Sequence, residues 1–333
     1  MKILVITLLI AISFQIQAQD RVLVFTKTNG FRHSSIAAGV TMISDLGIAN
    51  GLWVTTQTED SNDFTATNLA QYKAVIWCNT SGDNLLNASQ RVAFENFIAN
   101  GGGFVGIHAA TDTYRDGSWP FYNELVGGIV QTSPNHTANN FNATMTVLNS
   151  HPSVDFLGTT WSKTEEYYYW RNNGGYLYTG NVNLLRVEST GSNNYDEARP
   201  ISWYKEYAGG RSFYTALGHN ASDYSSNANF IKHIEEAIKY VIRNTLSIPS
   251  IDFANEFEIL ENPVKNSLIV NFPATIGVNK AIIYDLKGNI LCEKEIHIAD
   301  KAIFFNVEDF SKGVYIVTIE NALQKISLKF IKK

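Results

Sequence analysis

Short apolar runs alternate with helix-like segments over the first part of the chain. Residues 22–25, 53–57, 74–77 and 104–107 each have the length and character of a buried parallel strand. Before the last of these runs, Asn87 and Gln90 form a helix N-cap pattern, and residues 101–103 are three glycines that end the helix. Its predicted apolar face consists of Val92, Phe94, Phe97 and Ile98. This alternation predicts a doubly wound α/β sheet.

The pattern changes further along the chain. Residues from about 140 to 215 are mostly strand-like, and 227–243 predict a closing amphipathic helix. From 259 to 333, short apolar runs at 268–272, 281–284, 302–305 and 314–319 are separated by turn signals such as Lys287-Gly288-Asn289. This tail predicts a small all-β sandwich that follows the α/β domain.

Composition supports a division into two domains. All nine arginines and all six tryptophans lie at or before Arg243. We predict an α/β domain over 21–246, a linker over 247–258 and a β domain over 259–333. Residues 1–18 predict a secretory signal peptide, with Lys2, an apolar stretch from Ile3 to Ile12, and Ala18 before the cleavage site.

Charge and hydropathy exclude several partners. The net charge is −5 and the chain has no basic block, which argues against nucleic acid and anionic membranes. After the signal, no segment reaches the roughly 20 apolar residues of a membrane-spanning helix, so none is expected.

Three histidines stand where predicted strands end. His33 follows the first apolar run, His108 the fourth, and His219 the run at 212–217. Because parallel strands bring their carboxyl ends to one edge of a sheet, these side chains can converge. Imidazoles act as general acids and bases, or they bind a divalent metal such as zinc. The chain has no HExxH motif, so the sequence does not decide whether a metal binds, and His33, His108 and His219 are its ligands if one does.

The other histidines carry weaker signals. His136 and His151 lie in loop-like segments, and His233 lies within the closing helix, where we expect a solvated face.

Carboxylates near the histidines are also candidates for a catalytic or metal-binding site. Asp112 lies shortly after His108, and Glu165-Glu166 precede four aromatic residues, 167–170. Adjacent residues of a strand point to opposite faces, so only one of the two glutamates can enter a site together with Tyr168. The aromatic run is either core, or core on one face and a sugar platform on the other.

The α/β part resembles the ThuA-like (trehalose utilisation) family. The matching pieces are Gly30-Phe-Arg-His-Ser34, Gly101-Gly-Gly-Phe-Val-Gly-Ile-His-Ala-Ala-Thr-Asp112, Leu125-Val-Gly-Gly128, His151-Pro152, Glu165-Glu-Tyr-Tyr168, Pro200-Ile-Ser-Trp203 and Gly210-Arg211 to Gly218-His219. The resemblance implies a flavodoxin-like three-layer sandwich, of the class I glutamine amidotransferase kind, and a role in disaccharide metabolism. Where the family often has Asp-Glu, this chain has Glu165-Glu166, which leaves open which carboxylate points inward.

The same resemblance limits the chemistry. His108 stands at the elbow where amidotransferases carry their nucleophile, and Cys78 follows another strand. We therefore expect no glutamine amidotransferase activity. The candidate catalytic residues are His108, His33, His219, Glu166 and Asp112. The candidate substrate-binding residues are Arg211, Tyr168, Trp203 and Ser34.

The tail resembles a type IX secretion sorting domain. The matching pieces are Asn262-Pro263, Tyr284-Asp-Leu-Lys-Gly288, Gly313-Val-Tyr315 and Leu328-Lys-Phe-Ile-Lys-Lys333. The resemblance implies that the type IX machinery is a partner, and that the protein passes through the periplasm to be secreted or held at the outer-membrane surface.

Two functions remain open from the sequence. One is a sugar-processing hydrolase or isomerase that acts on a disaccharide, glycoside or keto-sugar through the histidines and carboxylates, with Arg211 orienting the substrate. The other is a non-catalytic carbohydrate-binding protein of the cell surface, which the aromatic-rich segment 167–178 favours. A carbohydrate is the expected ligand of both.

Overall fold

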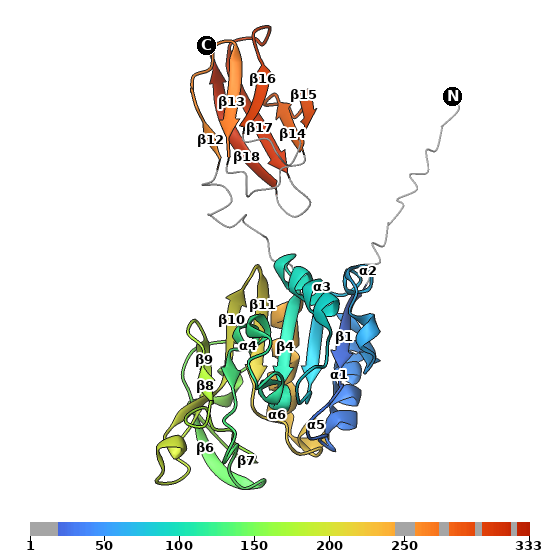
Figure 1. The fold of residues 1–333 in the computed structure, drawn as a ribbon, viewed down its shortest axis with the longest axis vertical. Coiled ribbons are helices and arrows are strands. Elements are labelled where there is room, and N and C mark those ends of the chain that lie inside the picture. The colour runs from blue at the N-terminus through green and yellow to red at the C-terminus, as the bar shows by residue number, and fades with distance from the viewer. Residues whose placement is uncertain (1–18, 244–256, 273–279, 297–301, 321–324) are drawn as a thin grey trace, which may run out of the picture. The chain divides into compact units, whose positions relative to one another are not determined.

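A computed structural model describes residues 19–243, 257–272, 280–296, 302–320 and 325–333 (Figure 1). The chain divides into two compact units between Arg243 and Asn244, and each is described by itself. The predicted signal peptide, 1–18, and most of the predicted linker, 247–256, lie outside the described residues.

One nine-stranded sheet organises the first unit, in the order β2-β1-β3-β4-β11-β10-β9-β6-β7. The strands β2 (Trp53–Thr58), β1 (Asp20–Phe25), β3 (Ala74–Cys78), β4 (Gly103–Ile107) and β11 (Gly210–Thr215) are mutually parallel. Their order is that of flavodoxin-like folds, whose ligands bind at the carboxyl ends of the strands beside the β1/β3 switch point. The predicted fold class is confirmed.

Helices cover both faces of the parallel strands (Figure 1). On one face, α1 (Ile36–Asn50), α5 (Asp223–Ser226) and α6 (Ala228–Ile242) pack together. On the other lie α2 (Ala66–Leu69), α3 (Ala88–Ala99) and α4 (Pro120–Val126). Every residue of β3 and β4 is buried between these layers, which explains why their sequences are continuously apolar.

The structure confirms most of what the sequence pattern predicts for helix α3. Asn87 and Gln90 form a reciprocal capping box at its start, and Phe94, Phe97 and Ile98 are buried. Val92 is 54% exposed, so its predicted place on the apolar face is wrong.

Four antiparallel strands extend the sheet: β10 (Arg199–Tyr207), β9 (Val182–Val187), β6 (Phe141–Val147) and β7 (Thr160–Glu165). A short separate ribbon pairs β5 (Gly128–Ile129) with β8 (Tyr176–Leu177). Although β7 stands at the far end of the sheet, Glu165 accepts a hydrogen bond from the Gly218 N–H after β11. The extension therefore curls back towards the carboxyl ends of the parallel strands.

The second unit consists of two antiparallel sheets around one apolar core. One contains β12 (Glu258–Ile259), β13 (Ser267–Asn271) and β16 (Ala302–Asn306). The other contains β15 (Ile290–Glu295), β14 (Lys280–Tyr284), β17 (Gly313–Glu320) and β18 (Lys325–Lys332). This is the predicted all-β module. Within the described residues of both units, no helix is both long and apolar enough to cross a membrane.

His233 corrects one expectation about α6. Its ring is fully buried rather than solvated, because it shares the buried stripe of the helix with Phe230, Ile234 and Ala237. Nδ1 donates to the Ser153 carbonyl at 2.9 Å. Burial lowers the pKa of His233 to about 4.

This burial predicts a pH-dependent loss of stability. The pKa of a histidine in the unfolded chain is about 6.5, so folding favours the neutral ring of His233. The contribution of this ring to the free energy of unfolding is therefore complete above about pH 6.5. Between about pH 6.5 and pH 4 the contribution falls by about 3 kcal/mol. Chemical denaturation of the wild type and of His233→Asn across this range measures it. The variant is expected to lose less unfolding free energy on acidification, and parallel losses would contradict the assignment.

Candidate functional site

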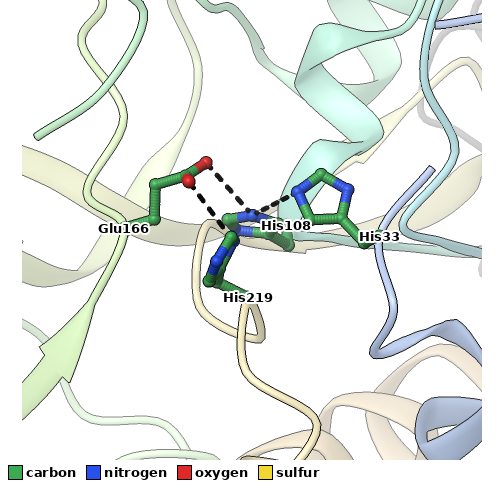
Figure 2. A group of neighbouring side chains, drawn as sticks. All are labelled: His33, His108, Glu166 and His219. Atoms are coloured by element: carbon green, nitrogen blue, oxygen red, sulfur yellow. Dashed lines mark hydrogen bonds and ion pairs between the residues drawn. The ribbon is translucent and has the colours of Figure 1, made fainter. Parts of the chain in front are cut away.

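Four side chains from separate segments meet at the carboxyl edge of the sheet (Figure 2). His33 follows β1, His108 follows β4, His219 follows β11, and Glu166 follows β7. One nitrogen or carboxylate oxygen from each lies within 4.8 Å of those of the others. We refer to these four residues as the His/Glu cluster. It contains all three strand-end histidines expected from the sequence.

His108 occupies a strained elbow at the end of β4. Its φ is +48°, in the left-handed region that non-glycine residues rarely adopt, and the side chain is fully buried. The turn is tightly packed, since a Cβ on Gly106 would lie 3.1 Å from that of Ala110. Its backbone therefore has the sharp strand-to-helix character of a nucleophile elbow, with an imidazole in place of a thiol or hydroxyl.

A backbone carbonyl fixes the orientation of the His108 ring. Nδ1 lies 2.8 Å from the Ala216 oxygen, which can only accept, so Nδ1 carries a proton. Nε2 consequently faces the cluster, 3.2 Å from His33 Nε2 and 3.6 Å from Glu166 Oε1. A histidine held by its other ring nitrogen in this way has the arrangement common among metal ligands.

Two ring nitrogens of the cluster lack hydrogen-bond partners among the described residues. They are Nδ1 of His33 and Nδ1 of His219, both buried. The second lies 3.3 Å from Glu166 Oε2, close enough for an ion pair but poorly aligned for a hydrogen bond. Unpaired buried polar atoms are costly, so His219 Nδ1 favours a further binding group in the cluster, whereas His33 faces the cluster through Nε2 (Figure 2).

The cluster's pKa values are set by burial and mutual charge. Burial, helped by the neighbouring His108, lowers the pKa of His33 to about 3. Burial also lowers the pKa of His219. For His108, burial is outweighed by the Glu166 carboxylate 3.6 Å away and by the charge of Glu165, so the pKa rises. The pKa of Glu166 falls despite burial, because it faces His108, His136 and His219.

The two adjacent glutamates have different partners. Glu166 enters the cluster, whereas Glu165 is fully buried behind it and accepts hydrogen bonds from the Gly218 and His219 N–H groups at 2.8 and 3.1 Å. Lys163 pairs with Glu165 at 2.8 Å and holds the pKa of that carboxyl low against the opposing effect of burial. Glu165 thus positions the loop that carries His219.

Tyr168 is the candidate substrate-binding residue that contacts the cluster. Its ring stacks on that of His108 with centroids 4.7 Å apart, and its hydroxyl lies 3.2 Å from His108 Nε2. All four residues of the run Tyr167–Trp170 are at most 5% exposed. Of the two alternatives that the sequence left open for this run, the structure therefore supports core alone.

Asp112 and Ser34 lie close to cluster residues along the chain. Asp112 ends a short 3₁₀ turn that starts at His108, and it pairs with Arg115 at 2.9 Å. Burial raises its pKa to about 6. Ser34 is exposed and lines a cavity of about 470 Å³ together with Arg32 and His33.

Arg211 and Trp203 lie elsewhere, so their predicted roles at this site are wrong. Arg211 is at the amino end of β11, paired in register with Gly103 at the start of β4, and its guanidinium donates to the Tyr240 and Arg243 carbonyls. Trp203 is fully buried, and its indole donates to the Val126 carbonyl. Arg211 is at the opposite edge from the cluster, and Trp203 is part of the core.

His136 is a neighbour of the cluster that the sequence did not single out. Its Nδ1 lies 3.6 Å from Glu166 Oε2, and its side chain is 25% exposed. A β-bridge between His136 and Tyr168 brings its loop to the site. No local spacing reveals such a contact, because it depends on how two distant loops pack.

Comparison with known proteins extends these observations. Residues 21–241 match the family model described as trehalose utilisation (ThuA), and residues 259–333 match that of a secretion system C-terminal sorting domain. No curated protein matches the chain.

Two solved structures share the fold of the first unit. A ThuA-like protein from Bacteroides uniformis is 20% identical, with a TM-score of 0.54 over 67% of this chain and 92% of that one. One from Parabacteroides merdae is 18% identical, with a TM-score of 0.52 over 70% of this chain and 94% of that one.

The backbone conformation of the loop that carries His219 can be tested by substituting Gly218. Gly218 has a φ of +113°, and a Cβ there would lie 2.5 Å from the Tyr224 hydroxyl. Gly180 has a φ of +86° with open space around it. Gly218→Ala is expected to lower the unfolding free energy by about 3 kcal/mol, and Gly180→Ala by about 1 kcal/mol, since only the former adds a clash. Equal losses in denaturant titrations would show that the Tyr224 contact does not constrain this loop.

Proposed function

Because the chain belongs to the trehalose utilisation (ThuA) family, we propose that it is an exported enzyme that processes a disaccharide, glycoside or keto-sugar through the His/Glu cluster. Hydrolysis and isomerisation are the two reaction types proposed. The sorting domain at 259–333 indicates export to the cell surface or beyond, through type IX secretion machinery. The proposed route runs through the periplasm.

The observation that carries the proposal is the convergence of three imidazoles and one carboxylate within 4.8 Å. This donor set suits zinc, which favours imidazole nitrogens and carboxylate oxygens. The fixed ring of His108 and the unpartnered Nδ1 of His219, beside Glu166, support the fit. The cluster would hold the ion, which would supply a Lewis acid able to polarise a sugar oxygen or to lower the pKa of a water molecule.

The chain's own residues would supply orientation and proton transfer. The Ala216 carbonyl holds His108, and the Glu165 carboxylate holds the backbone of His219. The Tyr168 hydroxyl, beside His108, can donate a hydrogen bond to a substrate oxygen. Asp112, with a pKa of about 6, can exchange a proton near neutral pH, as a general acid or base requires.

Turnover assays test the proposal. The full chain is incubated with zinc and a panel of trehalose, other disaccharides, aryl glycosides and keto-sugars, and product is measured. Turnover of at least one sugar is expected, with losses of at least about 100-fold in His108→Ala and His219→Ala. A chelator is expected to lower the rate, and added zinc to restore it.

The matched control is His151→Asn, which changes a histidine that packs on Tyr204 and Tyr240. It should retain turnover. Unchanged turnover in both cluster variants overturns the proposal. Calorimetry against the same panel identifies the alternative, since binding without product indicates a non-catalytic carbohydrate-binding protein.

A further inference from the structure

A groove of about 520 Å³ lies outside the His/Glu cluster, between residues 170–177 and 194–200. Its volume falls within the range of small-molecule sites. The lining residues that matter here are Trp170, Arg171, Asn172, Tyr176, Asn194 and Tyr195. One wall includes β8, which Figure 1 shows beside the sheet extension.

Two tyrosines give the groove apolar surfaces. Tyr176 is 44% exposed, and Tyr195 is half-buried against Tyr169, with ring centroids 4.8 Å apart. Tyrosine offers a large, rigid ring with a polar end, which suits ligands that have both apolar faces and hydroxyl groups.

Two amides flank the tyrosines. The side chains of Asn172 and Asn194 are exposed and make no hydrogen bond with any residue that the structure describes. Each offers two N–H donors and one carbonyl acceptor. A ligand rich in hydroxyl groups, which both donate and accept, can satisfy these amides in place of water.

The charged side chains of the groove are already engaged within the protein. Arg171 forms an ion pair with Glu197. The third charged lining residue, Arg199, donates through Nε to the Tyr168 carbonyl and through Nη1 to the Asp196 carbonyl. Because Arg171 is paired and Arg199 is buried with its donors used by backbone carbonyls, neither guanidinium is free to bind a phosphate or carboxylate, and the groove favours a neutral ligand.

Hydrogen bonds hold both walls in place. The Asn173 carbonyl accepts from the Thr132 N–H and hydroxyl at 3.3 and 2.9 Å. On the other side, the Asp196 carboxylate accepts from the Asn193 N–H at 3.0 Å and from the Tyr169 hydroxyl at 2.8 Å. A groove with fixed walls loses little conformational entropy when it binds.

We propose that this groove is a binding site for a neutral oligosaccharide, separate from the His/Glu cluster. Sugar rings would lie against Tyr176 and Tyr195, and their hydroxyl groups would bond to Asn172 and Asn194. The site goes beyond the proposed reaction, because it would hold the exported protein on a glycan whether or not the cluster turns over a sugar.

Isothermal titration calorimetry of the full chain tests the site with maltohexaose, cellohexaose and xylohexaose, and with an oligogalacturonide as the anionic comparison. At least one neutral hexasaccharide is expected to bind, and Tyr176→Ala and Tyr195→Ala are each expected to weaken its binding about tenfold. Phe156→Ala, which removes another exposed aromatic ring, should leave binding unchanged.

Three results would overturn the proposal: no binding of any neutral hexasaccharide, binding that survives both tyrosine substitutions, or a preference for the oligogalacturonide. His108→Ala separates this site from the cluster. Binding that is lost in His108→Ala and kept in the tyrosine variants assigns the glycan to the cluster and refutes the groove. Binding lost only in the tyrosine variants supports the groove even if the protein has no turnover.

Discussion

The buried carboxylate of Glu165 holds the two halves of the first unit together at the site. An ionised group without contact to water costs several kcal/mol unless its charge and lone pairs are satisfied. Here Lys163 supplies the opposite charge, and the backbone N–H groups of Glu166, Gly218 and His219 supply hydrogen bonds. The antiparallel extension is thereby joined to the loop after β11, and Glu166 and His219 are brought face to face.

Strand direction made much of this site predictable. Apolar runs of strand length, each followed by a histidine, place His33, His108 and His219 at one edge of a parallel sheet before any coordinates are known. The structure brings them together because β1, β4 and β11 end within about one residue of one another: Phe25 pairs with Trp77, next to Cys78, and Ile107 pairs with both Cys78 and Thr215. Strand direction also explains why the predicted role of Arg211 is wrong. Arg211 lies near the start of the strand that His219 follows, so it is at the opposite edge of the sheet.

Features that depend on packing between distant segments were not predictable. His136 reaches Glu166 only because its loop bridges to Tyr168. Which of the two glutamates faces the histidines depends on the curl of β7 back towards β11, which no local pattern encodes. The burial of 167–170 and of Trp203 likewise follows from how the extension folds over the sheet. The sequence therefore indicates which types of residue form the site, and the packing of distant segments decides which individual residues reach it.

The proposed function depends on the His/Glu cluster binding a metal ion through imidazole and carboxylate. X-ray absorption spectroscopy of the zinc-loaded full chain is the decisive measurement. We expect nitrogen and oxygen ligands at about 2.0–2.1 Å with the scattering of about three imidazoles, and the loss of one imidazole or of the metal in His108→Ala. A sulfur ligand at about 2.3 Å, or a shell of oxygens without imidazole, would contradict it.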